Sequence, residues 1–465
     1  MKDFREQAHK LADWIADYLE NAERFPVLSR VRPGEIRDAL PAQAPEHGEA
    51  FDAIFADFER VILPGVTHWN HPGFFAYFAI TSSAPGILAE FLSAALNQQA
   101  MLWRTSPAAT ELEEVSLGWL RKLVGLPADF EGVIYDTASV STLHALAAAR
   151  EAAVPGVRAR GLAGRGDIHG VRVYCSEHAH SSVDKAVILL GLGHEALRKI
   201  PADVEFRMKP EALARAISED RAAGLIPIAA VATVGSTSST SVDPVAEISA
   251  ICRRENVWLH VDGAYAGVAA MVPGYEWILR DAARADSIVL NPHKWLFTPF
   301  DLSVLYCRRM DVLRQAFSLT PEYLKTSEGD AGVRNLMDTG IQLGRRFRAL
   351  KLWMILRHFG AKGLRDALAN HMELARKFAG WVDASARFER VAPVPFSVVC
   401  FRLRDADDET QARILEAVNA SGEVFLSHTR LDGRYVLRLA IGHLQTAERH
   451  VARAWELLNS SAAEL

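Results

Sequence analysis

Apolar and polar positions follow two different periods along this chain, and the pattern predicts where helices and strands lie. Near the start, apolar residues recur at helical spacing, which predicts an amphipathic helix that ends before Pro26. A second apolar stripe over residues 51–62 predicts another helix, closed by Pro64 and Gly65. Two short helices cannot bury their apolar faces alone, so this N-terminal helical segment, residues 1–84, must pack on the large domain or on a second copy.

The middle of the chain alternates short apolar runs with helical patterns, which is typical of a mainly parallel sheet covered by helices on both faces. After residue 350 the pattern becomes helix, strand, helix and strand, with a last helix over 446–458. We therefore expect an α/β protein with a large domain at 85–350 and a small α/β domain at 351–465. The strands predicted for the large domain are 132–135, 171–175, 227–234, 257–261, 287–290 and 302–307.

Two of these predicted strands end in side chains that can carry chemistry. Asp262 directly follows the strand at 257–261, and Lys294 lies four residues after the strand at 287–290. The carboxyl ends of neighbouring parallel strands meet at one rim of a sheet, so we expect both side chains at the same crevice. Each alone is weak evidence, because strand-end acids often bind a backbone amide and most lysines are solvated. Together they suit pyridoxal phosphate, which needs an amine for a Schiff base and an anion beside its ring nitrogen.

The residues around this pair resemble the group II pyridoxal-phosphate-dependent decarboxylases, specifically the aromatic-L-amino-acid decarboxylase family. The resemblance implies the PLP-dependent transferase-like fold (fold type I), pyridoxal 5′-phosphate as cofactor, and a homodimer with shared active sites in which the N-terminal segment packs on the partner. The matching segments are HVDGAYAG from His260, NPHKW from Asn291, HWNHPGFFAYF from His68, LWRTSPAATELE from Leu102, YCSEHAHSSVDKA from Tyr174, LGRRFRALKLW from Leu343 and YVLRLAIG from Tyr435.

A phosphate site is expected where Thr137 follows a predicted strand and opens a predicted helix. Backbone amides at a helix start bind anions, although an ordinary serine N-cap would give the same pattern. The resemblance places the phosphate here and on residues near Lys294. The cofactor contacts that it implies, besides Asp262 and Lys294, are Ala138, Ser139, His180, Thr237, Ala264, Asn291 and His293.

Two histidines follow the predicted strand at 171–175. A neutral imidazole is flat, so it can stack on a pyridine ring and offer a nitrogen to a carboxylate. For an isolated residue, a hydrogen-bonded core histidine is the commoner role. The resemblance assigns the stacking role to His180, whereas His178 has only the structural interpretation.

The segment HWNHPGFFAYF is rich in aromatic residues, and core or interface packing accounts for at least half of them. The resemblance places the pocket for the substrate ring here. The substrate-binding candidates are therefore Trp69, Tyr77 and Phe78, with Met101 and Trp103 contributed by the other subunit.

Two further positions bear on the substrate. Gly344 lies where the family shapes the pocket, and a glycine leaves room for a large ring such as indole. Where several relatives carry Pro-Thr, this chain has Ala79 and Ile80, which removes a hydroxyl group that could bind the substrate carboxylate. Carboxylate recognition would then depend more on His180. We expect an aromatic substrate, such as tryptophan, phenylalanine, tyrosine or dihydroxyphenylalanine, more than glutamate.

The stretch PEYLKTSEGDAGVRN from Pro321 is polar and aperiodic, as lids often are. Tyr323 matches the family's loop tyrosine, proposed to protonate the substrate α-carbon. Together with Lys294, Asp262 and His180 it makes up the expected catalytic set. Aldehyde-forming relatives typically carry phenylalanine at this position, so Tyr323 favours amine formation. An aldehyde synthase and a non-aromatic decarboxylase stay as alternatives, while transamination would call for an arginine clamp that the pattern does not reveal.

Composition narrows the choice of partners. The 465 residues leave room for two or three domains, and 49% hydrophobic with 23% charged residues is ordinary for a globular protein. A net charge of −5 without a basic run predicts neither nucleic acid nor membrane as a partner. The charged first residues and the absence of a long apolar run predict a cytoplasmic protein. Four widely spaced cysteines predict buried free thiols and no metal site.

Overall fold

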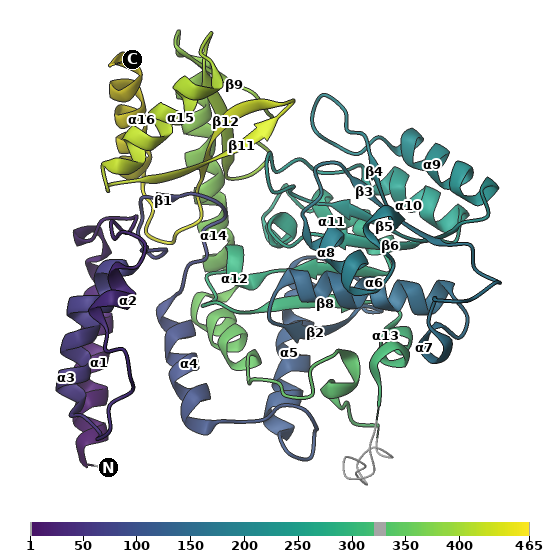
Figure 1. Ribbon diagram of the computed structural model, residues 1–465, viewed down its shortest axis with the longest axis horizontal. Coiled ribbons are helices and arrows are strands. Elements are labelled where there is room, and N and C mark those ends of the chain that lie inside the picture. The colour runs from purple at the N-terminus through teal and green to yellow at the C-terminus, as the bar shows by residue number, and fades with distance from the viewer. Residues whose placement is uncertain (1, 320–331, 465) are drawn as a thin grey trace.

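Two β-sheets organise the computed structural model of this chain, which describes residues 2–319 and 332–464 (Figure 1). The larger sheet has seven strands in the order β2-β8-β7-β6-β5-β3-β4, and the smaller has five in the order β1-β11-β12-β10-β9. The strands are β1 (Phe74–Phe75), β2 (Glu131–Tyr135), β3 (Val171–Ser176), β4 (Leu197–Ile200), β5 (Ile226–Thr233), β6 (Trp258–Asp262), β7 (Ser287–Leu290), β8 (Ser303–Cys307), β9 (Phe388–Arg390), β10 (Val398–Leu403), β11 (Phe425–Leu431) and β12 (Arg434–Ala440).

The large sheet is mainly parallel, as its alternation of apolar runs and helices predicted. Strands β7, β6, β5, β3 and β4 pair in parallel, while β8 runs antiparallel to both β7 and β2. All six predicted strands are present, within two residues at each end. The edge strand β4 was not predicted, because its sequence LRKI offers too few apolar positions to stand out.

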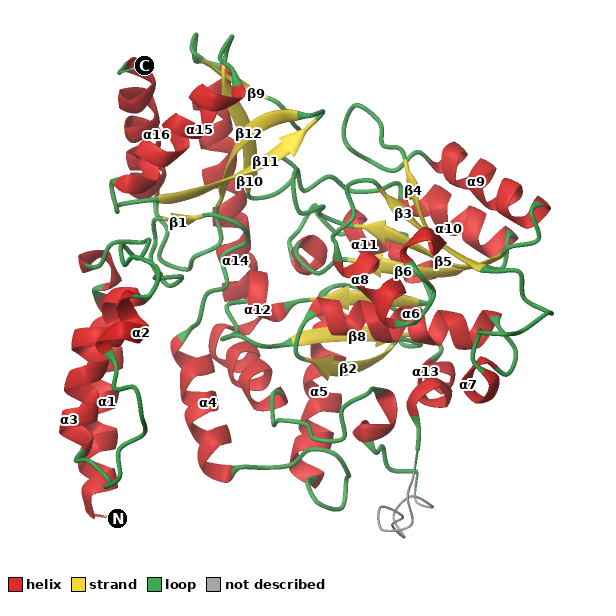
Figure 2. Cartoon of the chain, in the orientation of Figure 1, coloured by secondary structure: helices red, strands yellow, loops and turns green. Residues whose placement is uncertain are grey.

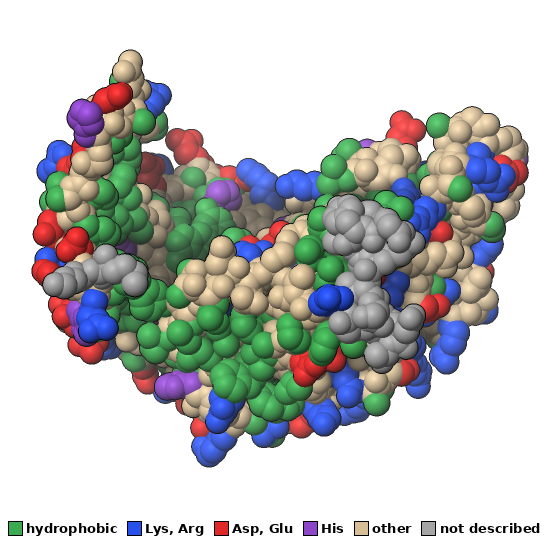
Figure 3. All heavy atoms as spheres, turned by 90° about the horizontal axis from the view of Figure 1, so that it is seen from below, with side chains coloured by type: hydrophobic (Ala, Val, Ile, Leu, Met, Phe, Trp, Pro, Cys, Tyr) green, Lys and Arg blue, Asp and Glu red, His purple; other side chains and the backbone are tan. Residues whose placement is uncertain are grey.

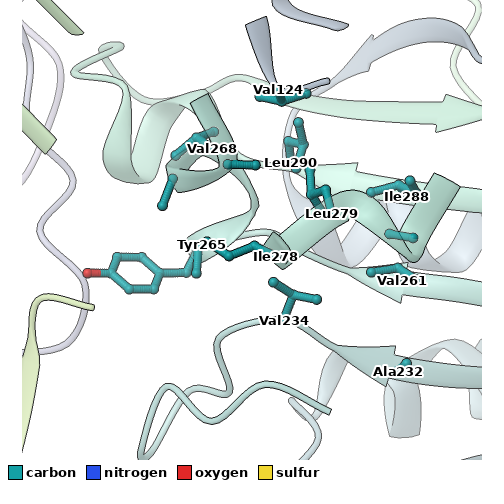
Figure 4. Packing of buried hydrophobic residues seen from close by; sticks show 14 of the residues in the cluster. Val124, Ala232, Val234, Val261, Tyr265, Val268, Ile278, Leu279, Ile288 and Leu290 are labelled. Atoms are coloured by element: carbon teal, nitrogen blue, oxygen red, sulfur yellow. The ribbon is translucent and has the colours of Figure 1, made fainter. Parts of the chain in front are cut away.

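Successive residues of these strands point to opposite faces, and each face carries its own core. On β3, for example, Val173 and Cys175 belong to one buried cluster and Tyr174 to the other. Helices α6, α8 and α13 cover one face, and α5, α9, α10 and α14 cover the other (Figure 2). On the second face, Val261 of β6 and Ile288 of β7 pack against the segment that follows β6 (Figure 4). Burial on both faces explains why these strands are nearly continuous apolar runs.

The helices connect and cover the strands, as an α/β order requires. They are α1 (Lys2–Glu20), α2 (Glu35–Ala39), α3 (Phe51–Asp57), α4 (Ala84–Leu96), α5 (Pro107–Leu123), α6 (Ala138–Ala153), α7 (Val157–Arg160), α8 (Ser182–Leu189), α9 (Pro210–Ala222), α10 (Val245–Arg254), α11 (Trp277–Arg280), α12 (Pro292–Trp295), α13 (Met310–Phe317), α14 (Ala349–Asp383), α15 (Asp408–Ala420) and α16 (Glu448–Ala463).

The small sheet is antiparallel except at its edge, where the N-terminal segment joins it. Phe74 and Phe75 of β1 pair in parallel with Phe425 and Leu426 of β11. Helices α14, α15 and α16 close the core of this sheet. Residues 74–75 lie within the segment expected to be helical, so the chain before residue 84 also contributes a strand to the small sheet.

The N-terminal helices form an arm beside the main body (Figure 1). Trp14 of α1 packs edge-on against Phe55 of α3, and its indole N–H donates to Glu59. The opposite side of α1 faces α4 across an apolar groove of about 830 Å³. Figure 3 shows hydrophobic side chains gathered beside the arm, where the surface is hollowed. Phe4, with 65% of its surface exposed, and Phe91, with 54%, line this groove.

Two expectations about the rest of the chain can be compared with the structure. All four cysteines are buried and free, as predicted. In the described ranges 2–319 and 332–464, no helix combines the length and apolarity needed to cross a bilayer.

Candidate active site

Asp262 and Lys294 lie at the same rim of the large sheet, because β6 and β7 run parallel and both end there. The Asp262 side chain is buried, and one of its oxygens accepts the backbone N–H of Ala264 at 3.0 Å. The carbonyl of Ala264 in turn accepts the N–H of Asn291 at 3.1 Å, which ties the two strand ends together. The other Asp262 oxygen accepts no hydrogen bond from the described residues and stays available as an acceptor.

The amine of Lys294 lies in an environment that disfavours its charged form. Its Nζ is 5.2 Å from the centre of the Phe78 ring. Burial is the largest cause that lowers the pKa of Lys294, Arg438 lowers it further, and Asp262 opposes them. An uncharged lysine amine is a nucleophile, so this environment suits attack on a carbonyl group.

His180 follows β3, whose end lies at the same rim as the ends of β5 and β6. Its Nδ1 accepts the backbone N–H of Ser182 at 3.1 Å, which leaves the hydrogen on Nε2. Burial lowers the pKa of His180 and Lys294 lowers it further, while Asp262 raises it. The structure therefore places a neutral imidazole where it interacts electrostatically with Asp262 and Lys294. His178 packs edge-on against Phe206 instead, in line with its structural interpretation.

Thr237 lies in the serine-rich turn after β5, at the same rim. Its side chain is exposed, whereas the neighbouring Ser236, Ser239 and Ser241 are buried and bonded to one another. This internal network fixes the turn and leaves Thr237 free to contact a ligand.

An anion site is available where α6 begins. Across the described residues, the backbone amides of Ala138 and Ser139 have no hydrogen-bond partner, as expected in the first turn of a helix. The first turn of α6 is also linked to strand β8, because Ser141 Oγ lies 2.8 Å from Ser303 Oγ.

His293 completes the polar side of this rim. Its Nδ1 accepts the N–H of Leu302, next to Ser303, at 2.9 Å, and burial lowers its pKa to about 3. The neutral ring therefore carries its hydrogen on Nε2 as a donor. The buried Oδ1 of Asn291 has no partner among the described residues, so the segment around Lys294 keeps unused polar groups.

An aromatic stack extends from the amine toward the small domain. Phe78 stacks on Tyr265 with ring centres 3.8 Å apart, and Tyr265 stacks on Trp295 at 4.7 Å. The Tyr265 side chain extends away from the aliphatic cluster behind the sheet (Figure 4), and its hydroxyl bonds with Ser397. Trp295 donates its indole N–H to His371 of α14 at 3.0 Å. The residue after Lys294 is thus held from the helix that leads to the small domain.

The other aromatic candidates separate into two groups. Trp69 stacks on Phe74 with ring centres 4.3 Å apart and on Tyr77 at 5.9 Å, and Tyr77 directly precedes Phe78 in the chain. Tyr77 has 55% of its surface exposed.

Met101, Trp103 and Gly344 form the second group. Met101 accepts the N–H of Met337 at 3.1 Å, and Trp103 donates to Glu111 at 2.8 Å. A Cβ at Gly344 would lie 3.3 Å from Gln99 Nε2. These three residues lie in or against the loop between α4 and α5. Tyr323 lies outside the described residues.

The sequence did not single out Arg438 of β12, although the matching segment YVLRLAIG contains it. Only 3% of this residue is exposed, and its Cζ lies 4.7 Å above the Phe78 ring. An arginine inside an otherwise apolar strand was the available signal, because a buried charge needs a reason.

The described groups fit pyridoxal 5′-phosphate on four counts. A buried lysine amine is held toward its neutral form, and a buried carboxylate keeps one free oxygen. Unpartnered helix-start amides and a neutral histidine donor suit the phosphate. A second neutral imidazole, that of His180, interacts electrostatically with Asp262 and Lys294. No group of three metal-ligating side chains occurs within residues 2–319 and 332–464.

Comparisons with known proteins agree with this chemistry. Residues 33–404 match the family described as the pyridoxal-dependent decarboxylase conserved domain. The chain is 42% identical to tryptophan decarboxylase 2 of Oryza sativa subsp. japonica, over 100% of this chain and 95% of that protein. It is 43% identical to phenylacetaldehyde synthase of Arabidopsis thaliana, over 100% and 96%. A crystal structure of Oryza sativa TDC with PLP and tryptamine superposes with a TM-score of 0.96 at 38% identity, covering 100% of this chain and 98% of that one.

Proposed function

The chain belongs to the pyridoxal-dependent decarboxylase family and uses pyridoxal 5′-phosphate, and from this premise we propose that it decarboxylates an aromatic L-amino acid to the aryl-alkylamine and carbon dioxide. The observation that carries the proposal is the position of Phe78, whose ring lies 5.2 Å from the amine of Lys294. Trp69 and Tyr77, whose rings stack on each other, are proposed to extend this aromatic surface. Such a wall favours a flat apolar side chain on the substrate over a second carboxylate.

When bound, the cofactor supplies an electron sink that stabilises the negative charge left when carbon dioxide departs. Lys294 is proposed to hold the cofactor covalently and to release the product amine. The free oxygen of Asp262 is proposed to accept a hydrogen bond from the ring nitrogen and to keep it protonated. The pKa of Lys294 is lowered mainly by burial, which supports its role as a nucleophile.

The Nε2–H of His180 is proposed to orient the substrate carboxylate, since Nδ1 already accepts the Ser182 N–H. Ala79 is buried against Gly442 and offers no hydroxyl for this task. The Phe78 ring is proposed to exclude water beside the carboxylate, which favours loss of its charge because charge is costly where water is excluded. Tyr323 is proposed to deliver the proton to the α-carbon, a role supported by the family resemblance of its segment.

The proposal is tested by incubating the purified protein with tryptophan, phenylalanine, tyrosine and dihydroxyphenylalanine and identifying the products. We expect the aryl-alkylamine and an equal amount of carbon dioxide from at least one of them. Borohydride reduction followed by peptide mapping should fix the cofactor on Lys294, and Lys294→Ala is the matched control. Turnover of glutamate alone would overturn the aromatic assignment.

Aldehyde formation is the second candidate, and the 43% identity to a phenylacetaldehyde synthase supports it. Such an enzyme consumes dioxygen and releases ammonia and hydrogen peroxide with the aldehyde. Tyr323 favours the amine, since aldehyde-forming relatives typically carry phenylalanine there. An oxygen electrode separates the two, because only aldehyde formation consumes dioxygen.

We also propose that the protein acts as a homodimer with shared active sites. The apolar groove between α1 and α4 supports this, because exposed side chains such as Phe4 and Phe91 need a partner. The family resemblance, which assigns Met101 and Trp103 to the substrate pocket of the other subunit, points the same way. Phe91→Glu should yield monomers in sedimentation, whereas Trp277→Glu, at another exposed apolar position, should leave the dimer intact.

A further inference from the structure

The small sheet contributes one buried charged side chain to the active site, Arg438. Its Nε donates to the carbonyl of Ser238 at 3.2 Å. Its Nη1 donates to the carbonyl of Tyr77 and, at 3.5 Å, to Ser427 Oγ. One guanidinium therefore joins the aromatic segment, the serine-rich turn after β5 and strand β11. A rigid planar fork can bind several acceptors at once, which a lysine ammonium on a flexible stem does less well.

The backbone of Tyr77 needs this support. Its φ is 51°, in the left-handed region, which residues other than glycine occupy only when their surroundings hold them. Its N–H donates to Ser427 Oγ at 3.1 Å, and its carbonyl accepts from Arg438. The small sheet thus holds the Tyr77 backbone at both its N–H and its carbonyl, and we call this pair of contacts the grip. Because Phe78 is the next residue, this grip also sets the direction of the Phe78 ring.

Two basic side chains lie near the Phe78 ring. Arg438 Cζ lies 4.7 Å and Lys294 Nζ 5.2 Å from its centre. Arginine stays protonated in proteins, so when two like charges are close the lysine is the one that yields its proton. The direction of the Lys294 pKa is consistent with this: burial lowers the pKa most, Asp262 opposes it by raising the pKa, and Arg438 lowers the pKa further. The titratable groups that interact with Lys294 are Asp262, His180, His293 and Arg438.

We propose that Arg438 is a positioning residue for Lys294: from the small sheet it holds the Tyr77–Phe78 peptide so that the Phe78 ring covers the amine, and it presents a fixed positive charge beside that amine. The inference rests on the proposed function only in taking Lys294 as the reactive lysine. It implies that the Lys294 amine stays uncharged only while the small sheet keeps its position against the large domain.

The charge is tested on full-length protein freed of cofactor, by labelling with a trace of acetic anhydride at several pH values. Peptide mass spectrometry gives the labelling of Lys294 relative to the exposed Lys362 in the same sample. R438Q removes the charge, so labelling of Lys294 should fall several-fold at a pH below its midpoint, about tenfold for each unit of pKa. R434Q, on the same strand with an exposed side chain, is the matched control. Unchanged labelling in R438Q would overturn the charge role.

The grip is tested by kinetics in two backgrounds. R438K loses the fork, and S427A loses the acceptor for the Tyr77 N–H, so each should lower kcat with a smaller change in KM. Tyr77→Gly adopts a positive φ without strain, so the loss caused by R438K should be at least threefold smaller in that background. An equal loss in both backgrounds would refute the grip, and this comparison decides even if R438Q does not fold. Labelling needs no substrate, so it still tests the charge of Arg438 if no aromatic acid is decarboxylated.

Discussion

Acid should destabilise this protein through three buried histidines, of which one precedes Lys294, one binds the Trp295 indole and one binds that second histidine. His293, His371 and His443 each accept a hydrogen bond on Nδ1, so none of them can gain a proton without breaking that bond. Burial lowers their pKa values to about 3, about 4 and about 3. The donors are the Leu302 N–H at 2.9 Å, the Trp295 indole at 3.0 Å and the Gln445 N–H at 3.1 Å, in the same order.

The sign follows from the direction of these pKa values. A histidine in the unfolded chain has a pKa near 6.5, so below that pH the unfolded state binds more protons than the folded state. The stability contributed by these rings is present above pH 6.5 and is lost as the pH falls toward their folded pKa values. Between pH 7.5 and 5.5 each ring costs about 1.4 kcal/mol, and the three together cost about 4 kcal/mol. That is a large part of a typical unfolding free energy of about 5–15 kcal/mol.

The assay is urea unfolding of the cofactor-free protein at pH 7.5 and 5.5, at one protein concentration. In His371→Gln the side-chain carbonyl can still accept from Trp295, and the amide can donate to the His443 carbonyl, which now accepts from the ring at 2.9 Å. The loss between the two pH values should therefore shrink by about 1.4 kcal/mol relative to the wild type. His47→Gln, at an exposed loop position, controls for the loss of a histidine. Equal pH dependence in the wild type and His371→Gln would refute the reasoning.

Three further predictions concern catalysis. Inactive Lys294→Ala and Met101→Glu chains, co-expressed in equal amounts, should recover about a quarter of wild-type activity if each site draws on both subunits, and activity no higher than in either variant alone would contradict sharing. Gly344→Ser, whose Cβ would lie 3.3 Å from Gln99, should lower kcat/KM for tryptophan about tenfold relative to tyrosine, as measured in direct competition. Tyr323→Phe should shift the product from amine to aldehyde with uptake of dioxygen, and an oxygen electrode with product chromatography would reveal an unchanged amine yield.

The large sheet could be predicted because its strands are buried on both faces. Runs such as SIVL at β7 stay apolar at every position after the first, and burial of Ser287 at the start of that strand is supported by the Trp258 indole, which donates to its hydroxyl. The two-residue strand β1 could not be predicted, since Phe74 and Phe75 form a strand only because β11 lies beside them. The pair Asp262 and Lys294 was predictable from strand order alone, because parallel neighbours end at one rim.

The remaining parts of the site depend on contacts between segments far apart in sequence. Arg438 lies 361 residues from the carbonyl that it binds, and no periodicity links it to Tyr77. The sequence contains Arg438 within a segment that matches the family, but its contacts with Tyr77, Ser238 and the Phe78 ring followed only from the fold.

These contacts give the N-terminal segment a part in the site. Its strand β1 pairs with β11, and both phenylalanines of β1 are completely buried in the fold. Phe78 follows Phe75 by only three positions, and the chain between them is gripped by Ser427 of β11 and Arg438 of β12. Three residues span at most about 11 Å, so the small sheet cannot shift far without moving the ring that covers Lys294. We therefore expect the small sheet and the N-terminal segment to move together with the ring that covers the Lys294 amine. A substitution in β11 or β12 can then alter the reactivity of a lysine on the other sheet.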